Sequence, residues 1–209
     1  MTYRCVATTV AGFVQQLAVC YVARGYIFYV TGTIPDHKDP VDTDRKIIGQ
    51  YGIDASKWTR SRRKKAGLAS VQYLRYGRFY VILANHGDHP FFAAEKKRLR
   101  DIRENPIRFR GYSISLHRAR GGGSWHASVR IEKARFLDLK DAFAQMAVHR
   151  PAECLWHEFR IIPFEHYAPV RNQLYMLLRM VNRKRKAAGL ELLPYAAVWQ
   201  PRFTVRPFD

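Results

Sequence analysis

Two histidines and an arginine near a glycine-rich turn have the chemistry that metal-independent RNA cleavage needs. His117 and His126 lie on either side of the turn at Gly121-Gly122-Gly123, and Arg130 follows on the same polar face. An imidazole can act as a general acid or base near neutral pH, and a guanidinium can stabilise the negative charge of the transition state. A polar face that binds phosphate or pairs with neighbouring strands explains the same residues more simply. We therefore treat them as candidates only and expect a chain that is not an enzyme.

Two other polar groups carry the donor atoms that divalent metal ions accept. The first is the loop His86-Gly87-Asp88-His89, whose spacing has no preset geometry. The second lies between a strand that ends in proline and the start of a helix, and it comprises Asp36, Asp39, Asp42 and Asp44. Aspartates at such a position commonly form turns and cap helices. The sequence therefore predicts no metal site, and it contains no motif for a cofactor.

Cations form the largest group of functional side chains. The 209 residues include 36 Lys and Arg against 17 Asp and Glu, which gives a net charge of +19. Such an excess attracts polyanions, because phosphate contacts release condensed counterions. We therefore expect a nucleic acid as the partner. The predicted contacts are Lys57, Arg60, Arg62, Arg63, Lys64, Lys65, Arg98, Arg100, Arg103, Arg179, Arg183, Lys184, Arg185 and Lys186.

A tryptophan lies inside the first basic cluster. Trp58 follows Lys57 directly, so its ring could either stack on a base or anchor its helix to the core. Of these two roles, we expect the anchoring one.

The remaining composition excludes several classes of protein. With 12 Tyr, 12 Phe and 4 Trp, the chain is too aromatic to be intrinsically disordered. Cys5, Cys20 and Cys154 form no CxxC pair, which argues against a disulfide framework and a zinc knuckle and favours a cytoplasmic location. The apolar stretch from 10 to 30 is interrupted by polar residues, so we expect no membrane partner.

Hydrophobic periodicity indicates which elements position these side chains. A helix is predicted from its apolar stripe of Val10, Phe13, Val14, Leu17, Tyr21 and Val22. Gly25 ends it, and a strand follows over 26–32. A basic helix is predicted over 92–104, and alternating residues on both sides of the glycine-rich turn predict a hairpin. A continuous helix follows, with the stripe Val170, Leu174, Leu177, Leu178 and Val181.

Short matches that recur in one order suggest an internal duplication. Ile34-Pro35 matches Ile162-Pro163, and the basic run before Ala66-Gly67-Leu68 matches the run before Ala188-Gly189-Leu190. Each copy is then predicted to run helix, strand, proline-flanked loop, helix, hairpin. The predicted organisation is α+β: a first pseudo-repeat at 1–87, an inserted basic helix and hairpin at 88–135, and a second pseudo-repeat at 136–209.

Two architectures agree with this order of elements. In a winged helix, 46–51 would be the positioning helix, 56–65 the recognition helix and 70–83 the wing. The run Arg63-Lys64-Lys65-Ala66-Gly67-Leu68 before a hairpin resembles winged-helix DNA-binding proteins, and a duplicated winged helix would resemble plasmid replication initiators. That resemblance implies binding to duplex DNA.

The other architecture is ferredoxin-like, and we favour it. Its first strand would be 25–34, its third 79–85, its second helix 92–104 and its fourth strand 108–117. The segments 27–32 and 76–81 resemble the two aromatic motifs of RNA-recognition domains. A tandem ferredoxin-like design with a glycine-rich loop is also similar to CRISPR RNA-processing endonucleases. Neither resemblance identifies a family.

We expect a basic protein that binds structured RNA through its phosphates, as part of a ribonucleoprotein or a mobile-element system. Duplex DNA binding by tandem winged helices is the first alternative, and metal-independent RNA cleavage is the second. The sequence does not decide between RNA and DNA.

Overall fold

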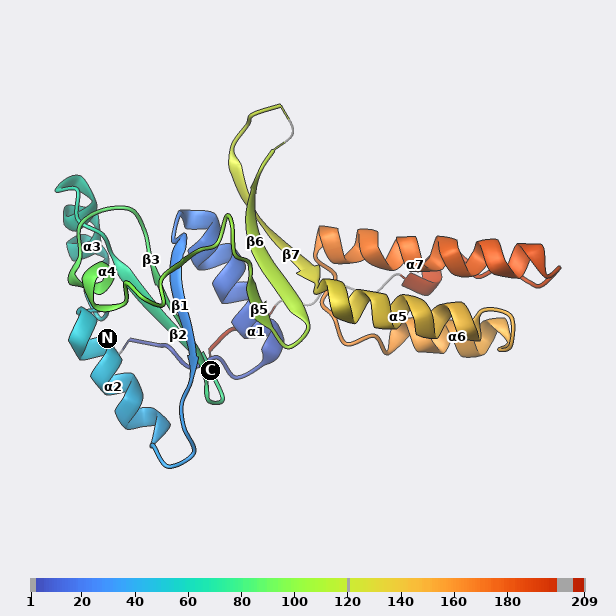
Figure 1. Cartoon of the computed structure of the whole chain (residues 1–209), viewed down its shortest axis with the longest axis horizontal. Coiled ribbons are helices and arrows are strands. Elements are labelled where there is room, and N and C mark those ends of the chain that lie inside the picture. The colour runs from blue at the N-terminus through green and yellow to red at the C-terminus, as the bar shows by residue number, and fades with distance from the viewer. Residues whose placement is uncertain (1–2, 120, 199–204, 209) are drawn as a thin grey trace. The chain divides into compact units, whose positions relative to one another are not determined.

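The computed structural model describes residues 3–119, 121–198 and 205–208. The chain is mixed α+β with two antiparallel sheets (Figure 1). It divides into two compact units, which are described separately below. Unit 1 comprises Met1–Ile107, Ile114–Ser128 and Val205–Asp209, and unit 2 comprises Arg108–Ser113 and Val129–Thr204.

The sheet of unit 1 has four strands. They are β1 (Phe28–Thr33), β2 (Val71–Tyr76), β3 (Phe79–Ala84) and the short β4 (Arg100–Asp101). Their order is β2-β3-β1-β4, and each neighbouring pair is antiparallel. β2 and β3 form the predicted hairpin, whose tip is closed by Gly77 at φ 56° and by Arg78. The Arg78 guanidinium donates to the carbonyl of Pro35 at 2.6 Å, so the tip is held against the loop after β1.

One face of this sheet is covered by the N-terminal helix. The helix runs through α1 (Val10–Gln15), a π-helical turn η1 (Gln16–Tyr21) and a 3₁₀ turn η2 (Val22–Arg24), and it ends at Gly25 with φ 91°. Most of the predicted stripe is buried, and Phe13 packs its ring edge-on against Tyr76 and Phe79. The predictions of this helix and of the strand after it are confirmed.

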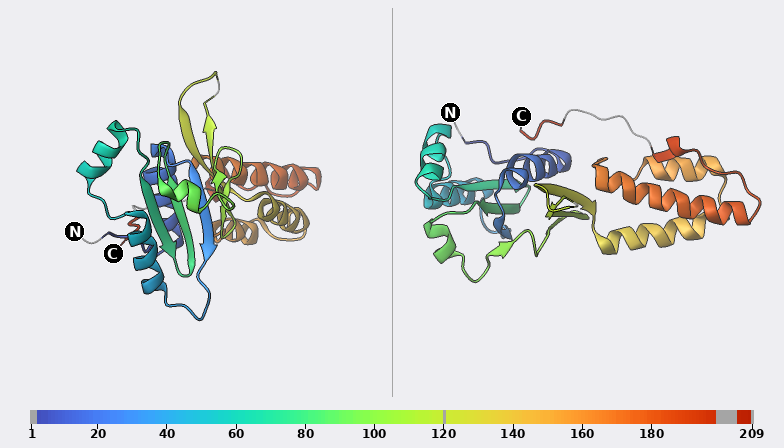
Figure 2. Two further views of the ribbon diagram at one scale, coloured as in Figure 1. Left: turned by 60° about the vertical axis from the view of Figure 1, so that its left-hand side comes forward. Right: turned by 90° about the horizontal axis from the view of Figure 1, so that it is seen from above.

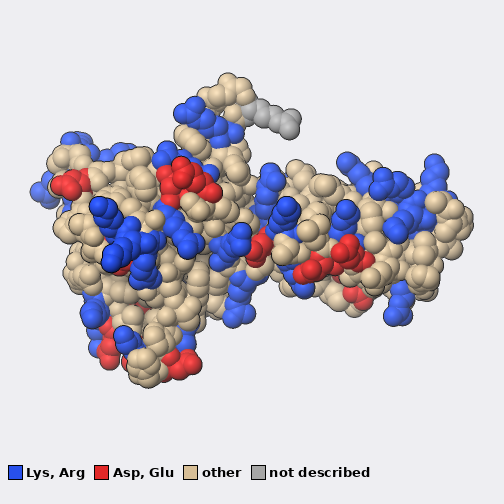
Figure 3. All heavy atoms as spheres, viewed as in Figure 1, with Lys and Arg blue, Asp and Glu red and all other residues tan. Residues whose placement is uncertain are grey.

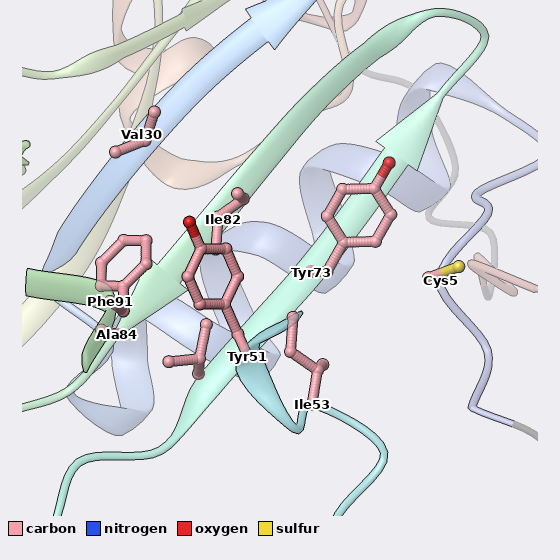
Figure 4. Close-up of a cluster of buried hydrophobic side chains, with 9 residues drawn as sticks. Cys5, Val30, Tyr51, Ile53, Tyr73, Ile82, Ala84 and Phe91 are labelled. Atoms are coloured by element: carbon pink, nitrogen blue, oxygen red, sulfur yellow. The ribbon is translucent and has the colours of Figure 1, made fainter. Parts of the chain in front are cut away.

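The opposite face is covered by two other helices (Figure 2). They are α2 (Pro40–Tyr51) and the short α4 (Pro90–Ala94). Tyr51 and Phe91 from these helices join Tyr73 and Ile82 of the sheet in one buried cluster (Figure 4). Asp39 caps α2, because its carboxylate accepts hydrogen bonds from the N–H groups of Val41 and Asp42. The prediction of a capping role is therefore confirmed for Asp39.

A buried ion pair joins α2 to β2. The Asp44 carboxylate accepts from the Arg75 guanidinium at 2.7 and 2.8 Å and from the Tyr73 hydroxyl at 2.6 Å. Burial and the hydrogen bond to Asp44 raise the pKa of Tyr73, so its hydroxyl remains a donor. Asp44 is therefore fully engaged in holding the fold. Asp36 and Asp42 form exposed ion pairs with Arg78 and Arg45.

Two predictions for the inserted segment are wrong. The helix expected over 92–104 ends at Ala94, because Ile102 instead donates its N–H to the Ile27 carbonyl and places β4 beside β1. The strand expected over 108–117 is divided into β5 (Ile107–Phe109) and β6 (Tyr112–Arg118). Arg110 and Gly111 both have positive φ, at 43° and 81°, as the centre of a type I′ turn requires. With β7 (Trp125–Ile131), these strands form a sheet in the order β5-β6-β7.

Unit 2 is mainly helical. It contains α5 (Lys133–Met146), α6 (Ala152–Arg160), α7 (Ala168–Ala187) and a 3₁₀ turn η3 (Tyr195–Val198). The predicted stripe of α7 is buried, and α5 packs along α7 (Figure 2). Gln173 of α7 bonds both backbone groups of Ile131, which fixes the helix to the end of β7.

The two proposed copies do not share one order of elements. Helix α6 occupies the place where the second copy was expected to have a strand, because Leu155 and Phe159 are spaced four apart and are both buried on one helix face. The hairpin expected around Arg202-Phe203 lies outside the described residues. The duplication therefore stays a hypothesis based on the sequence alone.

Candidate nucleic-acid interface

Helix α3 (Lys57–Lys65) is polar all round. It carries six cations and no acidic side chain, and none of its residues whose side chains are described is buried. Ser56 caps it by accepting from the Thr59 N–H at 3.1 Å. Arg60 and Arg63 tie it to the loop before it, by donating to the carbonyls of Ala55 and Gly52 at 2.7 and 3.3 Å. A helix without an apolar face gains little from core packing, so α3 depends on its cap and on these bonds to the preceding loop.

Trp58 is 78% exposed, so the prediction that it anchors its helix to the core is wrong. The physical reason is that α3 offers no other large apolar residue with which Trp58 could form a buried face. Arg62 and Lys65 follow it at positions i+4 and i+7 and are exposed on the same side of the helix. We call Trp58, Arg62 and Lys65 the α3 stripe.

A second cationic surface lies on α7. Arg179, Arg183, Lys184 and Lys186 are exposed, on the side away from the buried stripe. Figure 3 shows Lys and Arg gathered over α7, whereas Asp and Glu gather over α5. Three of these cations lie in the last turns, where the helix dipole favours positive charge. Within the described side chains, no carboxylate forms an ion pair with the arginines of α3, with Lys64 or Lys65, or with these four.

Arg185 is not part of that surface, and its prediction as a phosphate contact is wrong. It is 3% exposed, and its guanidinium donates to the backbone carbonyls of Glu191, Ala147 and Arg150 at 2.5, 2.9 and 2.8 Å. These bonds use three of its five N–H donors, and they hold the segments after α5 and α7 against the helix. The position four residues after Val181 continues the apolar stripe, which is the signal that could have revealed its burial.

The cations of the inserted segment are only partly available. Arg103 is held by Asp101 through bonds from both its side chain and its backbone, and Arg98 pairs with Glu95 and donates to the Thr31 carbonyl. Burial alone would raise the pKa of Asp101, but the hydrogen bonds from Arg103 lower it. This pair therefore stays ionised. Arg100 is exposed on β4.

The hairpin brings its two histidines together. Ala119 donates its N–H to the Ser124 carbonyl, and this register sets His117 opposite His126, with their ring centroids 6.5 Å apart. Both side chains are exposed, and a 2.9 Å hydrogen bond joins His117 Nε2 to the Ser115 hydroxyl. Arg130 is exposed further along β7.

His89 has a structural role. Its Nδ1 accepts from the Phe91 N–H at 3.0 Å and so caps α4. His86 packs edge-on against Phe28, with ring centroids 5.0 Å apart. Among the described residues, no three His, Cys, Asp or Glu side chains are arranged so that they could hold a metal ion.

A small pocket in unit 1 was not predicted. Its lining includes Trp125, Leu116, His86 and Arg103, together with residues around the end of the N-terminal helix. Five separate parts of the chain contribute to it, so no local pattern could reveal it. The one available signal was Trp125, a large aromatic residue next to the glycine-rich turn.

A scan of protein-family models finds no match to this chain, and searches of curated proteins and of solved structures find none either. In the parts of the chain that the structure describes, no helix combines the length and the apolar character needed to cross a membrane.

Proposed function

We propose that this protein binds structured RNA through phosphate contacts made by α3 and α7. The observation that carries the proposal is α3, a capped helix with six cations, no acidic residue and no buried face. Phosphates are the counter-charge that such a surface lacks, and they supply most of the affinity in nucleic-acid binding. The exposed cations of α7 provide a second surface of the same kind.

The α3 stripe favours a nucleic acid with unpaired bases. The exposed Trp58 ring offers a stacking platform, and Arg62 and Lys65 lie beside it. Aromatic rings of proteins stack on bases that have left the helix, as in RNA loops and single strands. The aromatic strands do not offer the same platform. Tyr29 is buried, and Phe79 packs against the N-terminal helix, so the motif-like segments 27–32 and 76–81 do not present an open stacking face.

The fold that best accounts for unit 1 is ferredoxin-like. Read from β4, the sheet order is β4-β1-β3-β2, and α2 and α4 both cover one face, as in a β-α-β-β-α-β unit. Here α3 is an addition to the first crossover, and the N-terminal helix covers the face that RNA-recognition domains leave open. A winged helix would instead pack its first helix with the other two, whereas α1 and α2 lie on opposite faces of this sheet.

Binding to RNA can be tested by electrophoretic mobility shift with a stem–loop RNA and a duplex DNA in competition. We expect the RNA to be bound and duplex DNA to compete poorly. Trp58→Ala should weaken RNA binding by about fivefold to a hundredfold, since stacking contributes roughly 1–3 kcal/mol per base. The double variant Arg62→Gln/Lys65→Gln should weaken it further.

The matched control is Arg135→Gln/Lys140→Gln, which removes two exposed cations from α5, where acidic residues are interspersed. It should bind like the wild type. Duplex DNA that displaces the RNA would favour the DNA-binding alternative, and no binding to either nucleic acid would reject the proposal.

Metal-independent RNA cleavage is a second candidate function. The cross-strand placement of His117 and His126 is the observation that favours it, because an acid and a base must both reach one phosphate. Incubation of the bound RNA with excess chelator tests it. Cleavage that His126→Ala abolishes without loss of affinity would establish the activity, and intact RNA would exclude it.

A further inference from the structure

The pocket of unit 1 has the composition of a small aromatic binding site. Its lining includes the apolar side chains of Val22, Ile27 and Leu116, together with Trp125, which is 42% exposed. His86 and Arg103 supply the polar groups. The imidazole of His86 can donate or accept a hydrogen bond, so it suits the edge of a heterocyclic ring.

Two guanidinium groups lie over the Trp125 ring. The Cζ atoms of Arg103 and Arg118 are 5.8 and 5.2 Å from its centroid. The charge of Arg103 is compensated by Asp101, which holds it through paired hydrogen bonds. Arg118 is exposed, and within the described part of the chain no carboxylate forms an ion pair with it. Arg118, beside Trp125, is therefore the cation near the pocket that can engage an anion.

The size of the pocket limits its occupant. Its volume is about 270 Å³. Pockets for drug-sized ligands usually measure about 300–1,000 Å³, so this one suits a single aromatic ring system and not a dinucleotide. A flat, partly apolar ring suits the apolar lining and Trp125, and an attached phosphate suits Arg118 beside them.

We propose that this pocket takes one unpaired nucleotide, with its base packed beside Trp125 and its phosphate held by Arg118. The inference rests on the proposed function in one respect: the nucleotide is taken to belong to a bound RNA strand. The chemistry of the pocket would accept a free nucleoside monophosphate in the same way.

The loop that carries His86 also connects this pocket to α3. After α3 ends, Ala69 donates its N–H to the Asp88 carbonyl at 3.0 Å, and Asp88 donates to the Gly67 carbonyl at 3.2 Å. The Ser70 N–H is bonded to the Asn85 side chain at 2.6 Å. The loop that carries His86 is therefore fixed by hydrogen bonds to the segment that follows α3.

Saturation-transfer NMR with AMP, adenosine and ribose 5-phosphate tests the pocket directly. We expect AMP to bind the wild-type protein. Trp125→Leu should weaken AMP binding at least fivefold, and Arg118→Gln should weaken AMP but not adenosine. Trp156→Leu is the matched control, because Trp156 is 41% exposed in α6 of the other unit. Trp125→Phe keeps an aromatic wall and should retain most of the binding even if the leucine variant folds poorly.

A stem–loop RNA with 2-aminopurine in its loop tests whether the nucleotide comes from a strand. Binding should quench the 2-aminopurine fluorescence, and Trp125→Leu should reduce the quenching while Trp156→Leu does not. The proposal for the pocket is overturned if RNA binds but AMP gives no signal and Trp125→Leu leaves the quenching unchanged. The proposed function would then remain intact. AMP binding without RNA binding would contradict the proposed function and the assumption that the nucleotide belongs to an RNA strand. It would identify the pocket as a site for free nucleotides.

Discussion

At the scale of single residues, the structure assigns to His89 a role that depends on its protonation state. Its Nδ1 must be unprotonated to accept from the Phe91 N–H. Burial, and secondarily the nearby charge of Arg63, lower the pKa of His89 below its ordinary value of 6.5, although a hydrogen bond to the Tyr51 backbone acts in the opposite direction. The cap on α4 is therefore complete at neutral pH.

The stability of unit 1 should consequently decrease in mild acid. The unfolded chain takes up a proton at His89 as the pH falls below 6.5, before the folded chain does, so the free energy of unfolding drops until the folded His89 also titrates. His89→Asn keeps an acceptor for the cap and cannot titrate, so urea denaturation between pH 7 and 5 should show a weaker pH dependence. The same slope in this variant as in the wild type would contradict the assignment. His149→Asn, at an exposed position, is the control.

The buried Asp44–Arg75 pair gives a second prediction at this scale. Asp44→Asn leaves a buried guanidinium without its counter-charge, which typically costs about 3–5 kcal/mol of stability. Asp42→Asn breaks an exposed pair with Arg45 and should cost about 0–1 kcal/mol. Chemical denaturation of both variants measures the difference. Equal losses of stability in the two variants would mean that the burial of Asp44 does not increase the contribution of its ion pair.

At the scale of elements, the loop after β3 depends on Gly87. Its φ is 132°, and an added Cβ would collide with the Ala69 nitrogen and lie 2.6 Å from the Gly67 carbonyl oxygen. Gly87→Ala should therefore move this loop away from the end of α3 and lower the stability by roughly 1–3 kcal/mol. Thermal unfolding measures the loss.

Gly49→Ala provides the comparison for that variant. Gly49 lies inside α2, and an added Cβ there meets nothing within 4 Å, so this variant should gain about 0.5–1 kcal/mol. If Gly87→Ala were as stable as Gly49→Ala, the close approach of the loop to the end of α3 would have no structural importance.

The elements that periodicity predicts well are those whose partners lie along one helix or one hairpin. The stripe from Val170 to Val181 identified α7 because all its members face one core. Arg185 lies on the same stripe, and this position indicates burial although its residue type favours exposure. The structure of the segment around β4 does not follow from its local pattern, because it is decided by pairing with β1, which is distant in sequence. The exposure of Trp58 follows from the polar residues around it in α3, which offer it no apolar partner.

At the scale of the whole molecule, the salt dependence of binding should report both cationic surfaces. Each phosphate contact to single-stranded nucleic acid adds about 0.7 to the slope of log affinity against log salt. The triple variants Arg62→Gln/Lys64→Gln/Lys65→Gln in α3 and Arg179→Gln/Arg183→Gln/Lys186→Gln in α7 should each lower that slope. Fluorescence anisotropy over a salt series measures it.

Combining the two triple variants should lower the slope by the sum of their separate effects, if both surfaces contact one RNA. A slope that the α7 variant leaves unchanged would restrict the interface to α3. The Arg135→Gln/Lys140→Gln control tests whether any loss of positive charge has the same effect.

The last described residues of the chain, 205–208, belong to unit 1, so the synthesis of this unit is interrupted by that of unit 2. Thr8 donates its N–H to the Pro207 carbonyl, and Pro207 lies against Gly12 at the start of the N-terminal helix. A ribosome releases Pro207 long after Gly12. This flank of the N-terminal helix therefore stays uncovered until Pro207 has left the ribosome. Unit 1 reaches its final packing only after that point, whereas the contacts between α5 and α7 are available earlier.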